Sequence, residues 1–97
     1  MIENNRYLVE GYIEYLFANK NLSKNTILSY KDDLKKFISF IEQNDLKKLE
    51  NNTIQKYVKF LSDNFSPKSH SRKLSSLKAF FNYLFDLKLV NKNPIAD

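Results

Sequence analysis

The chain has 97 residues, of which 42% are hydrophobic and 14% aromatic, so it is long enough for one domain with a modest core. It has no Cys, which excludes disulfides and zinc–thiolate sites. A single Gly and two Pro are too few for the tight turns of sandwiches and barrels and favour an all-α fold, and the net charge of +5 is compatible with a polyanionic partner.

The basic side chains are unevenly distributed. Residues 66–92 contain six bases and one acid, whereas residues 1–19 contain one base and three acids. This separation suggests one face turned toward a polyanion, although a Lys-rich proteome would give a similar composition. No apolar run is long enough to span a membrane, and residues 1–10 lack a signal pattern, so we expect a cytoplasmic protein.

A first helix is predicted over residues 5–19. Its apolar positions form two adjacent stripes, which make an unusually wide apolar face. We therefore expect it to be buried on more than one side or to contact a partner. The stripe residues are Leu8, Val9, Tyr12, Ile13, Tyr15 and Leu16.

A second helix is predicted over residues 24–43, with Ser23 as its N-cap. Apolar residues recur at spacings of three and four and predict one buried face. These residues are Ile27, Tyr30, Leu34, Phe37 and Ile41. The polar residues fall elsewhere and predict a solvated face: Asp32, Asp33, Lys35, Lys36 and Ser39.

Residues 44–52 are expected to connect this helix to a third one, capped by Asn52 or Thr53 and ending near Asn64. The predicted buried stripe of the third helix is Ile54, Tyr57, Val58 and Leu61.

A fourth helix is predicted over residues 67–87, because Ser66 followed by Pro67 is typical of a helix start. Its predicted core face is Leu74, Leu77, Phe81, Leu84 and Phe85. Residues 91–94 should stop it, since the residue before a proline avoids helical geometry. The whole of 1–97 is thus expected to be one domain, with a linker starting at about 91–97.

The opposite side of the fourth helix is the strongest candidate for a binding surface. With about 100° per residue, small and basic residues gather around Arg72, and Lys73 and Lys78 flank them. The gathered residues are Lys68, Ser69, Ser75, Ser76, Ala79 and Tyr83. Small side chains permit close approach to a DNA groove, and basic ones supply phosphate contacts. An ordinary solvated face, or a face packed on another helix, would show the same pattern.

The start of the second helix is the other candidate. Ser23, Lys24, Asn25 and Thr26 place short polar groups at the positive end of a helix dipole. Simple capping explains Ser23 but leaves Asn25 unexplained.

We expect no catalytic residue, no metal and no cofactor in this chain. Tyr12, Tyr30 and Tyr57 lie on apolar stripes, and a nucleophilic tyrosine would need several Arg, His and Lys side chains around a phosphate. The chain has one His, two arginines placed in different helices and no Gly-rich phosphate loop.

Two stretches have a pattern shared with known proteins. One is Ser23-Lys-Asn-Thr26 with Tyr30, Asp33-Leu34 and Phe37; the other is Ser69-His-Ser-Arg72-Lys-Leu74 with Phe81 and Tyr83. Together with Asn91-Lys-Asn-Pro94, they resemble the N-terminal core-binding domain of tyrosine recombinases of the Xer and phage-integrase type. The resemblance covers nearly the whole chain. It implies a compact, SAM-like bundle of four main helices that forms one jaw of a clamp on duplex DNA.

In that family the second and fourth helices approach the major groove. Carried over by position, the resemblance implies DNA contacts from Asn25, Thr26, Ser29, Lys68, Ser69, Arg72, Lys73, Ser76 and Lys78. Relatives often have arginine where Lys78 stands, so a phosphate contact is expected there rather than a base contact.

The resemblance also implies partners and a parent protein. The partners would be a duplex recombination half-site and other recombinase protomers in a synaptic complex, with the first helix available to a neighbour. The catalytic domain of the parent would lie outside this chain. Two rival interpretations stay open: a helix-turn-helix regulator and a helical protein–protein adaptor.

Overall fold

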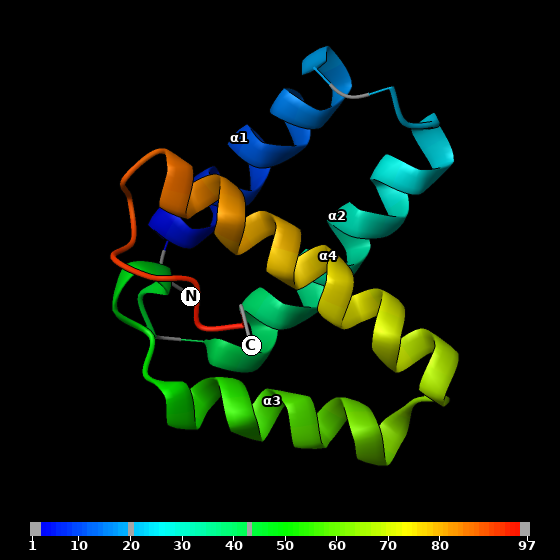
Figure 1. Ribbon diagram of the computed structural model, residues 1–97, viewed down its shortest axis with the longest axis vertical. Coiled ribbons are helices and arrows are strands. Elements are labelled where there is room, and N and C mark those ends of the chain that lie inside the picture. Colours follow the sequence, from blue (N-terminus) through cyan, green and yellow to red (C-terminus); the bar gives the residue numbers. More distant parts are fainter. Residues whose placement is uncertain (1–2, 20, 43, 96–97) are drawn as a thin grey trace.

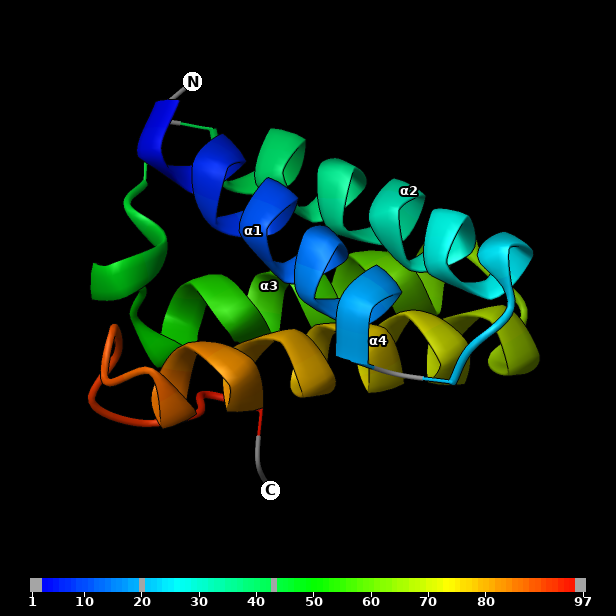
Figure 2. The ribbon, with the colours of Figure 1, turned by 90° about the horizontal axis from the view of Figure 1, so that it is seen from above.

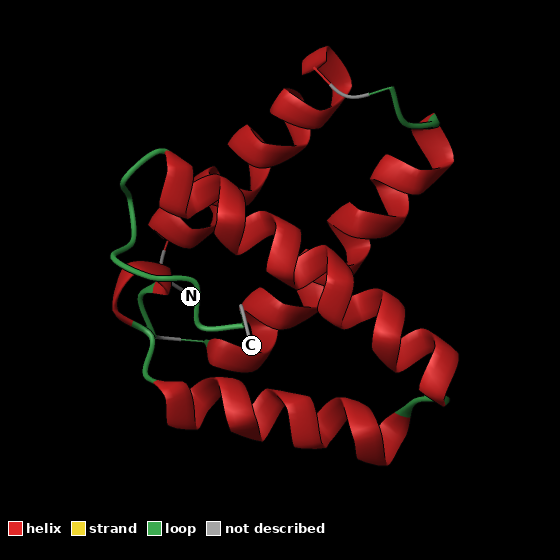
Figure 3. Ribbon diagram, in the orientation of Figure 1, coloured by secondary structure: helices red, strands yellow, loops and turns green. Residues whose placement is uncertain are grey.

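Four α-helices and one 3-10 turn make up the part of the chain that the computed structural model describes, residues 3–19, 21–42 and 44–95 (Figure 3). The elements are α1 (Glu3–Asn19), α2 (Lys24–Ile41), η1 (Leu46–Lys48), α3 (Asn51–Asn64) and α4 (Pro67–Asp86). No strand occurs in these residues. The predicted all-α bundle of four main helices is therefore confirmed.

The helices are arranged in two groups. In Figure 1, α1 and α2 lie side by side and run in opposite directions, and α4 crosses in front of both. Figure 2, a view from above, places α1 and α2 on one side of the molecule and α4 on the other. The bundle therefore has two distant faces, one formed by α4 and one by the α1–α2 pair.

Local capping signals explain where two of the helices begin. The Ser23 hydroxyl accepts a hydrogen bond from the Thr26 N–H at 3.1 Å, and the Ser66 hydroxyl accepts one from the Ser69 N–H at 3.3 Å. Both caps were predicted. The predicted cap of α3 is wrong: Glu50 occupies the N-cap position and makes no side-chain capping bond.

The core lies where α4 crosses α2. Leu34, Phe37, Phe80, Phe81 and Leu84 are completely buried there. The wide apolar stripe of α1 is covered by contacts with both α2 and α4. Burial within the bundle thus explains the width of that stripe without a neighbouring protomer.

Asn5 joins the start of α1 to the segment after α2. Its amide nitrogen donates to the Asn44 carbonyl at 2.8 Å, and its amide oxygen accepts from the Leu46 N–H at 3.0 Å. The Asn5 side chain is fully buried, so both hydrogen bonds are shielded from water. The expected connector contains η1, with Leu46 in the core, while Gln43, the predicted end of the second helix, lies outside the described residues.

The chain after α4 folds back along it. Lys88 adopts a left-handed conformation (φ 61°), and the Leu89 N–H donates to the Leu84 carbonyl at 2.9 Å, which closes the helix end. The Asn93 amide then donates to the Asn82 side chain at 2.6 Å, and Ile95 packs against the core. Residues up to 95 are thus tied to the bundle, while Ala96 and Asp97 lie outside the described residues.

Candidate nucleic-acid interface

The N-terminal end of α2 presents short polar side chains to solvent. Asn25 is exposed, and no hydrogen bond of its side chain occurs within the described residues. Thr26 is half-buried, and its hydroxyl accepts a hydrogen bond from the Ser23 hydroxyl at 2.8 Å. Capping therefore accounts for Ser23 and Thr26, whereas Asn25 is available to a ligand.

The outward face of α4 is basic and has small side chains along its middle. Its exposed residues are Lys68, Ser71, Arg72, Ser75, Lys78 and Ala79. This surface, which we call the α4 face, looks away from the bundle toward the viewer in Figure 1. A backbone without bulky side chains can approach a groove closely, so the surface suits contact with a duplex.

Arg72 connects the α4 face to α2. Its Nη2 donates to Asp33 Oδ1 at 3.0 Å, while half of its side chain surface remains open to solvent (50%). Ser29 and Asn25 lie about one and two turns before Asp33 on the same helix. The ion pair therefore ties Arg72 to the middle of α2, where α4 crosses that helix in Figure 1.

Asp33 is the centre of a buried polar cluster. Its side chain is 2% exposed, and Oδ1 also accepts a hydrogen bond from Lys73 Nζ at 2.9 Å. The Ser76 hydroxyl lies 3.5 Å from Oδ2 and donates to the Lys73 carbonyl at 3.0 Å. Asp33 was predicted to lie on a solvated face, and that prediction is wrong.

Lys73 and Ser76 were also predicted to lie on or beside the outward face, and the structure corrects both placements. The Lys73 side chain is 5% exposed, and its ammonium lies 4.7 Å from the centroid of the Phe65 ring. Ser76 is 2% exposed. Neither side chain can reach a ligand on the α4 face without rearrangement of the bundle.

The source of this error is the choice between two phenylalanines. The predicted core face ran through Phe85, which is 47% exposed, and omitted Phe80, which is completely buried. With about 100° per residue, replacing Phe85 by Phe80 turns the buried side of α4 toward Lys73 and Ser76. Arg72 consequently lies at the edge of the outward face rather than at its centre.

The cluster leaves one positive charge at the surface. One carboxylate (Asp33) faces two bases (Arg72 and Lys73), so the group as a whole is cationic, and Arg72 is its exposed member. A buried carboxylate needs such pairing because desolvation of an isolated charge is costly. The arrangement fixes the guanidinium in place and leaves several of its N–H groups free to donate to a ligand.

The structure brings seven of the nine expected DNA-contacting residues to accessible positions on α2 and α4. They are Asn25, Thr26, Ser29, Lys68, Ser69, Arg72 and Lys78. Sequence reasoning missed Asp33 as a member of the site and left out Ser71, which is exposed beside Arg72. The partners of Asp33 are 39 to 43 residues away, so no local pattern could identify them.

Two tyrosines are held in their neutral form. Burial raises the pKa of Tyr12 to about 12, and the nearby phenols of Tyr30, Tyr15 and Tyr83 add to the effect. Burial, followed by the charge of Asp33, raises the pKa of Tyr57 to about 12. Both rings are 3% exposed, as expected for core residues.

Comparison with known proteins identifies the class of this chain. Residues 9–88 match the family model described as "Phage integrase, N-terminal SAM-like domain", and the chain belongs to this family. No solved structure matches the chain significantly. Within the described residues, no helix is both long and apolar enough to cross a membrane, and no group of three metal-ligating side chains occurs.

Several curated relatives are tyrosine recombinases. The chain is 35% identical to tyrosine recombinase XerC of Anoxybacillus flavithermus, over 98% of this chain and 33% of that protein. It is 36% identical to a tyrosine recombinase of Agathobacter rectalis, over 89% of this chain and 28% of the relative. It is 34% identical to tyrosine recombinase XerD of Rickettsia bellii, over 92% of this chain and 30% of the relative. The chain thus spans about a third of the length of these relatives.

Proposed function

We propose that this chain binds duplex DNA as the N-terminal core-binding domain of a site-specific tyrosine recombinase. The observation that carries the proposal is the α4 face, where an ion pair with Asp33, in the middle of α2, holds the half-exposed Arg72. This face carries exposed cationic and small polar side chains along one helix, and the start of α2 adds further short polar groups. Such a surface fits phosphates and the edge of a groove.

The individual roles follow from exposure and chemistry. Lys68 and Lys78 are exposed and contribute phosphate contacts, because an ammonium acts as a point charge. Arg72 has a forked donor set, which suits a phosphate or a guanine edge. Asn25, Thr26, Ser29 and Ser69 contribute short hydrogen bonds to the sugar–phosphate backbone. Lys73 and Ser76 are not included as direct contacts, because both are buried.

The wider setting is part of the same proposal. Strand cleavage would belong to the parts of the curated relatives that this chain does not match, and the domain would help to grip a recombination half-site. The protein partners would be other recombinase protomers in the synaptic complex. The protein would act in the cytoplasm, where the chromosome lies. The segment from residue 91 onward would lead toward the catalytic part.

The test is a titration of the chain with short DNA duplexes at several salt concentrations. Arg72→Ala and Lys68→Ala should each weaken binding and reduce the slope of log affinity against log salt by about one. The matched control is Lys56→Ala, which removes an exposed charge on α3. Unchanged affinity in both test variants would refute the proposed site.

The two rival functions give different outcomes. A protein–protein adaptor would show no salt-dependent binding to any duplex. A helix-turn-helix regulator would bind through two helices joined by a short turn. The pair α3–α4 has such a turn at residues 65–66, so Lys56→Ala would then weaken binding along with Arg72→Ala.

A further inference from the structure

A second cationic site lies on the face of the bundle opposite α4. A pocket of about 380 Å³ opens between α1 and α2 and is lined by three basic side chains and one acidic one. The lining residues are Arg6, Val9, Glu10, Lys31, Lys35, Ile38 and Ser39. We call it the α1–α2 pocket. Figure 2 places α1 and α2 on the side of the molecule away from α4, so the pocket lies apart from the α4 face.

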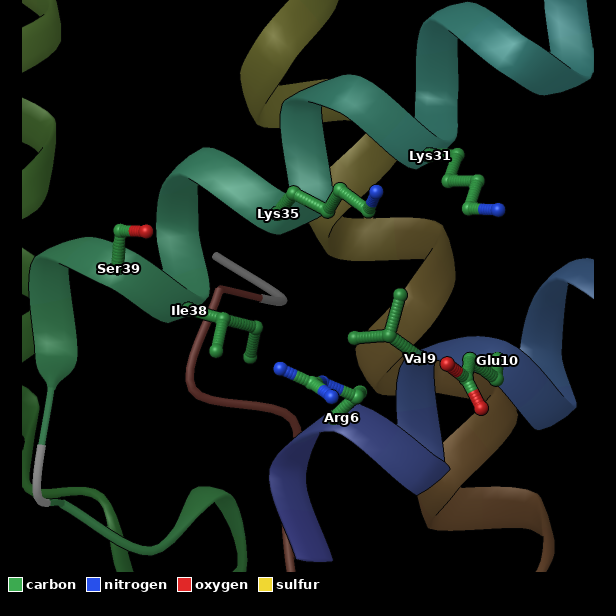
Figure 4. Close-up of a pocket in the computed structure, with 7 residues that line it drawn as sticks. All are labelled: Arg6, Val9, Glu10, Lys31, Lys35, Ile38 and Ser39. Atoms are coloured by element: carbon green, nitrogen blue, oxygen red, sulfur yellow. The ribbon is translucent and has the colours of Figure 1, made fainter. Parts of the chain in front are cut away.

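Basic side chains from both helices surround an apolar floor. Figure 4 shows the Arg6 guanidinium reaching from α1 toward Ile38, with Lys31 and Lys35 arriving from α2. Val9 and Ile38 form the floor, each 4% exposed. The methylene stems of the bases extend this apolar wall below the charges. The pocket therefore combines a cationic rim with an apolar interior.

The basic side chains of this rim form no ion pair among the residues that the structure describes. In the described part of the chain, no ion pair joins Arg6, Lys31 or Lys35 to a carboxylate. Lys36, the next residue on α2, is by contrast paired with Asp32 at 3.1 Å. Three unpaired cations with one acid at the rim leave a net charge of +2 for a ligand to neutralise.

The neighbouring surface adds an aromatic element. Lys35 and Ser39 also border a second hollow, of about 410 Å³, whose walls include Phe40 and Phe60. These two phenylalanines are 36% and 40% exposed, and their ring centroids are 5.3 Å apart. The outer side of α2 thus carries unpaired cations beside an exposed aromatic pair.

We infer that this outer side of α2 docks an acidic, amphipathic segment of a protein partner. Carboxylates of the partner would enter the α1–α2 pocket, and its apolar side chains would cover Phe40 and Phe60. The inference goes beyond DNA binding and does not depend on it. Charge complementarity selects an acidic partner, and the aromatic pair selects one with apolar side chains.

A nucleic acid fits this surface less well. Single strands bind by stacking bases on open aromatic faces. Here the Phe40 and Phe60 rings are tilted by 41° to each other, and Phe40 also meets Tyr57 edge-on at 62°. The two tilted rings present no common flat face for a base, so a flexible aliphatic side chain matches the surface better.

The wall of the pocket is held in place before any ligand arrives. Asn5, next to Arg6, is fully buried and hydrogen-bonded to the segment after α2. This anchor fixes the start of α1 against the end of α2. A rigid site loses less entropy when it binds.

The experiment uses a synthetic amphipathic helix with glutamates on one side and leucines beside them, and a copy with glutamine for every glutamate. Amide chemical shifts of the isotope-labelled chain report where each peptide binds. The acidic peptide should shift amides of Val9, Lys35, Ile38 and Ser39, and the glutamine copy should bind at least about fivefold more weakly.

Three variants separate the contributions. Arg6→Gln with Lys35→Gln should weaken the acidic peptide by about tenfold, whereas Lys48→Gln with Lys56→Gln removes the same charge elsewhere and should change little. Phe60→Gln should weaken both peptides, because it acts on the apolar contact. Equal loss in the test and control pairs would overturn the inference, since only overall charge would then matter.

Duplex DNA and oligothymidine serve as competing ligands on the same labelled chain. If either shifts the pocket amides and is weakened by Arg6→Gln with Lys35→Gln, the site is a nucleic-acid site and the inference fails. If duplex DNA shifts only α4 and the start of α2, the two sites are separate, as expected. If the unmodified chain binds the acidic peptide but does not bind duplex DNA, the proposed DNA function is refuted and the docking inference stands.

Discussion

Asp33 and Lys73 stand 40 residues apart in the sequence and form a buried ion pair at 2.9 Å, with side chains 2% and 5% exposed. The pair joins α2 to α4, and the same carboxylate oxygen holds Arg72 at the surface. The interior thus determines where a surface cation stands.

Removing one partner of this ion pair should lower the stability of the fold. In Asp33→Asn the Lys73 ammonium stays buried without its counter-charge, and the free energy of unfolding should fall by roughly 3 kcal/mol. Adding Lys73→Met removes the unpaired charge and should restore most of the loss. Urea denaturation measures both. The exposed Asp32–Lys36 pair is the control, and Asp32→Asn should cost less than about 1 kcal/mol. Equal losses for Asp33→Asn and Asp32→Asn would contradict the burial.

Arg72→Lys should weaken duplex binding although it preserves the charge. A guanidinium can donate to Asp33 through one nitrogen and to a phosphate through another, whereas lysine has a single nitrogen for both contacts. We expect a loss of about fivefold to tenfold, equivalent to about 1 kcal/mol, in a fluorescence titration. Lys68→Arg is the matched control, since Lys68 is exposed and is not required to contact a carboxylate and a phosphate at once. Binding that follows charge alone would leave Arg72→Lys unchanged.

Two adjacent serines test which side of α4 faces outward. Ser75 is exposed, so Ser75→Glu should leave stability within about 0.5 kcal/mol of the parent while repelling DNA. Ser76 is 2% exposed, and Ser76→Glu would place a second carboxylate beside Asp33. That variant should lose several kcal/mol of stability or fail to fold. Thermal melts combined with DNA titration distinguish the two, and the reverse pattern would show that α4 is turned the other way.

Local signals were sufficient to predict the four helices. Ser23, and Ser66 with Pro67, act through neighbouring residues, and the periodic apolar positions of α2 require no knowledge of a partner. The sequence alone did not determine which side of α4 is buried. Both Phe80 and Phe85 fit a helical stripe, and tertiary packing decides between them: Phe80 lies in the core, with its ring centroid 5.3 Å from that of Tyr12 on α1.

The candidate site was predictable only in part, through its exposed residues. The exposed bases Lys68, Arg72 and Lys78 follow from residue type and helical spacing. The burial of Asp33 and Asn5 does not, because their hydrogen-bond partners are about 40 residues away, at separations of 39 to 43 and 39 to 41. Polar residues whose role is tertiary look like surface residues in the sequence, which is why Lys73 and Ser76 were misplaced.

Alkaline pH should unfold the bundle through its two buried phenols. The pKa of Tyr12 and of Tyr57 is about 12 in the folded chain, because burial disfavours the phenolate, and about 10 when the chain is unfolded. A raised pKa means that the folded state holds the proton more tightly. The stabilisation is therefore complete below pH 10 and is lost as the pH rises from 10 through 12.

Tyrosinate absorbance during an alkaline titration checks this expectation. Tyr12→Phe and Tyr57→Phe should each remove one late-titrating phenol, and in urea all six tyrosines should titrate together near the ordinary value. Asp33→Asn with Lys73→Met should bring the Tyr57 titration to lower pH, since the Asp33 charge is the second cause of its shift. If the phenylalanine variants instead lose a phenol that titrates early, Tyr12 and Tyr57 are accessible to water and the core packing described above is wrong.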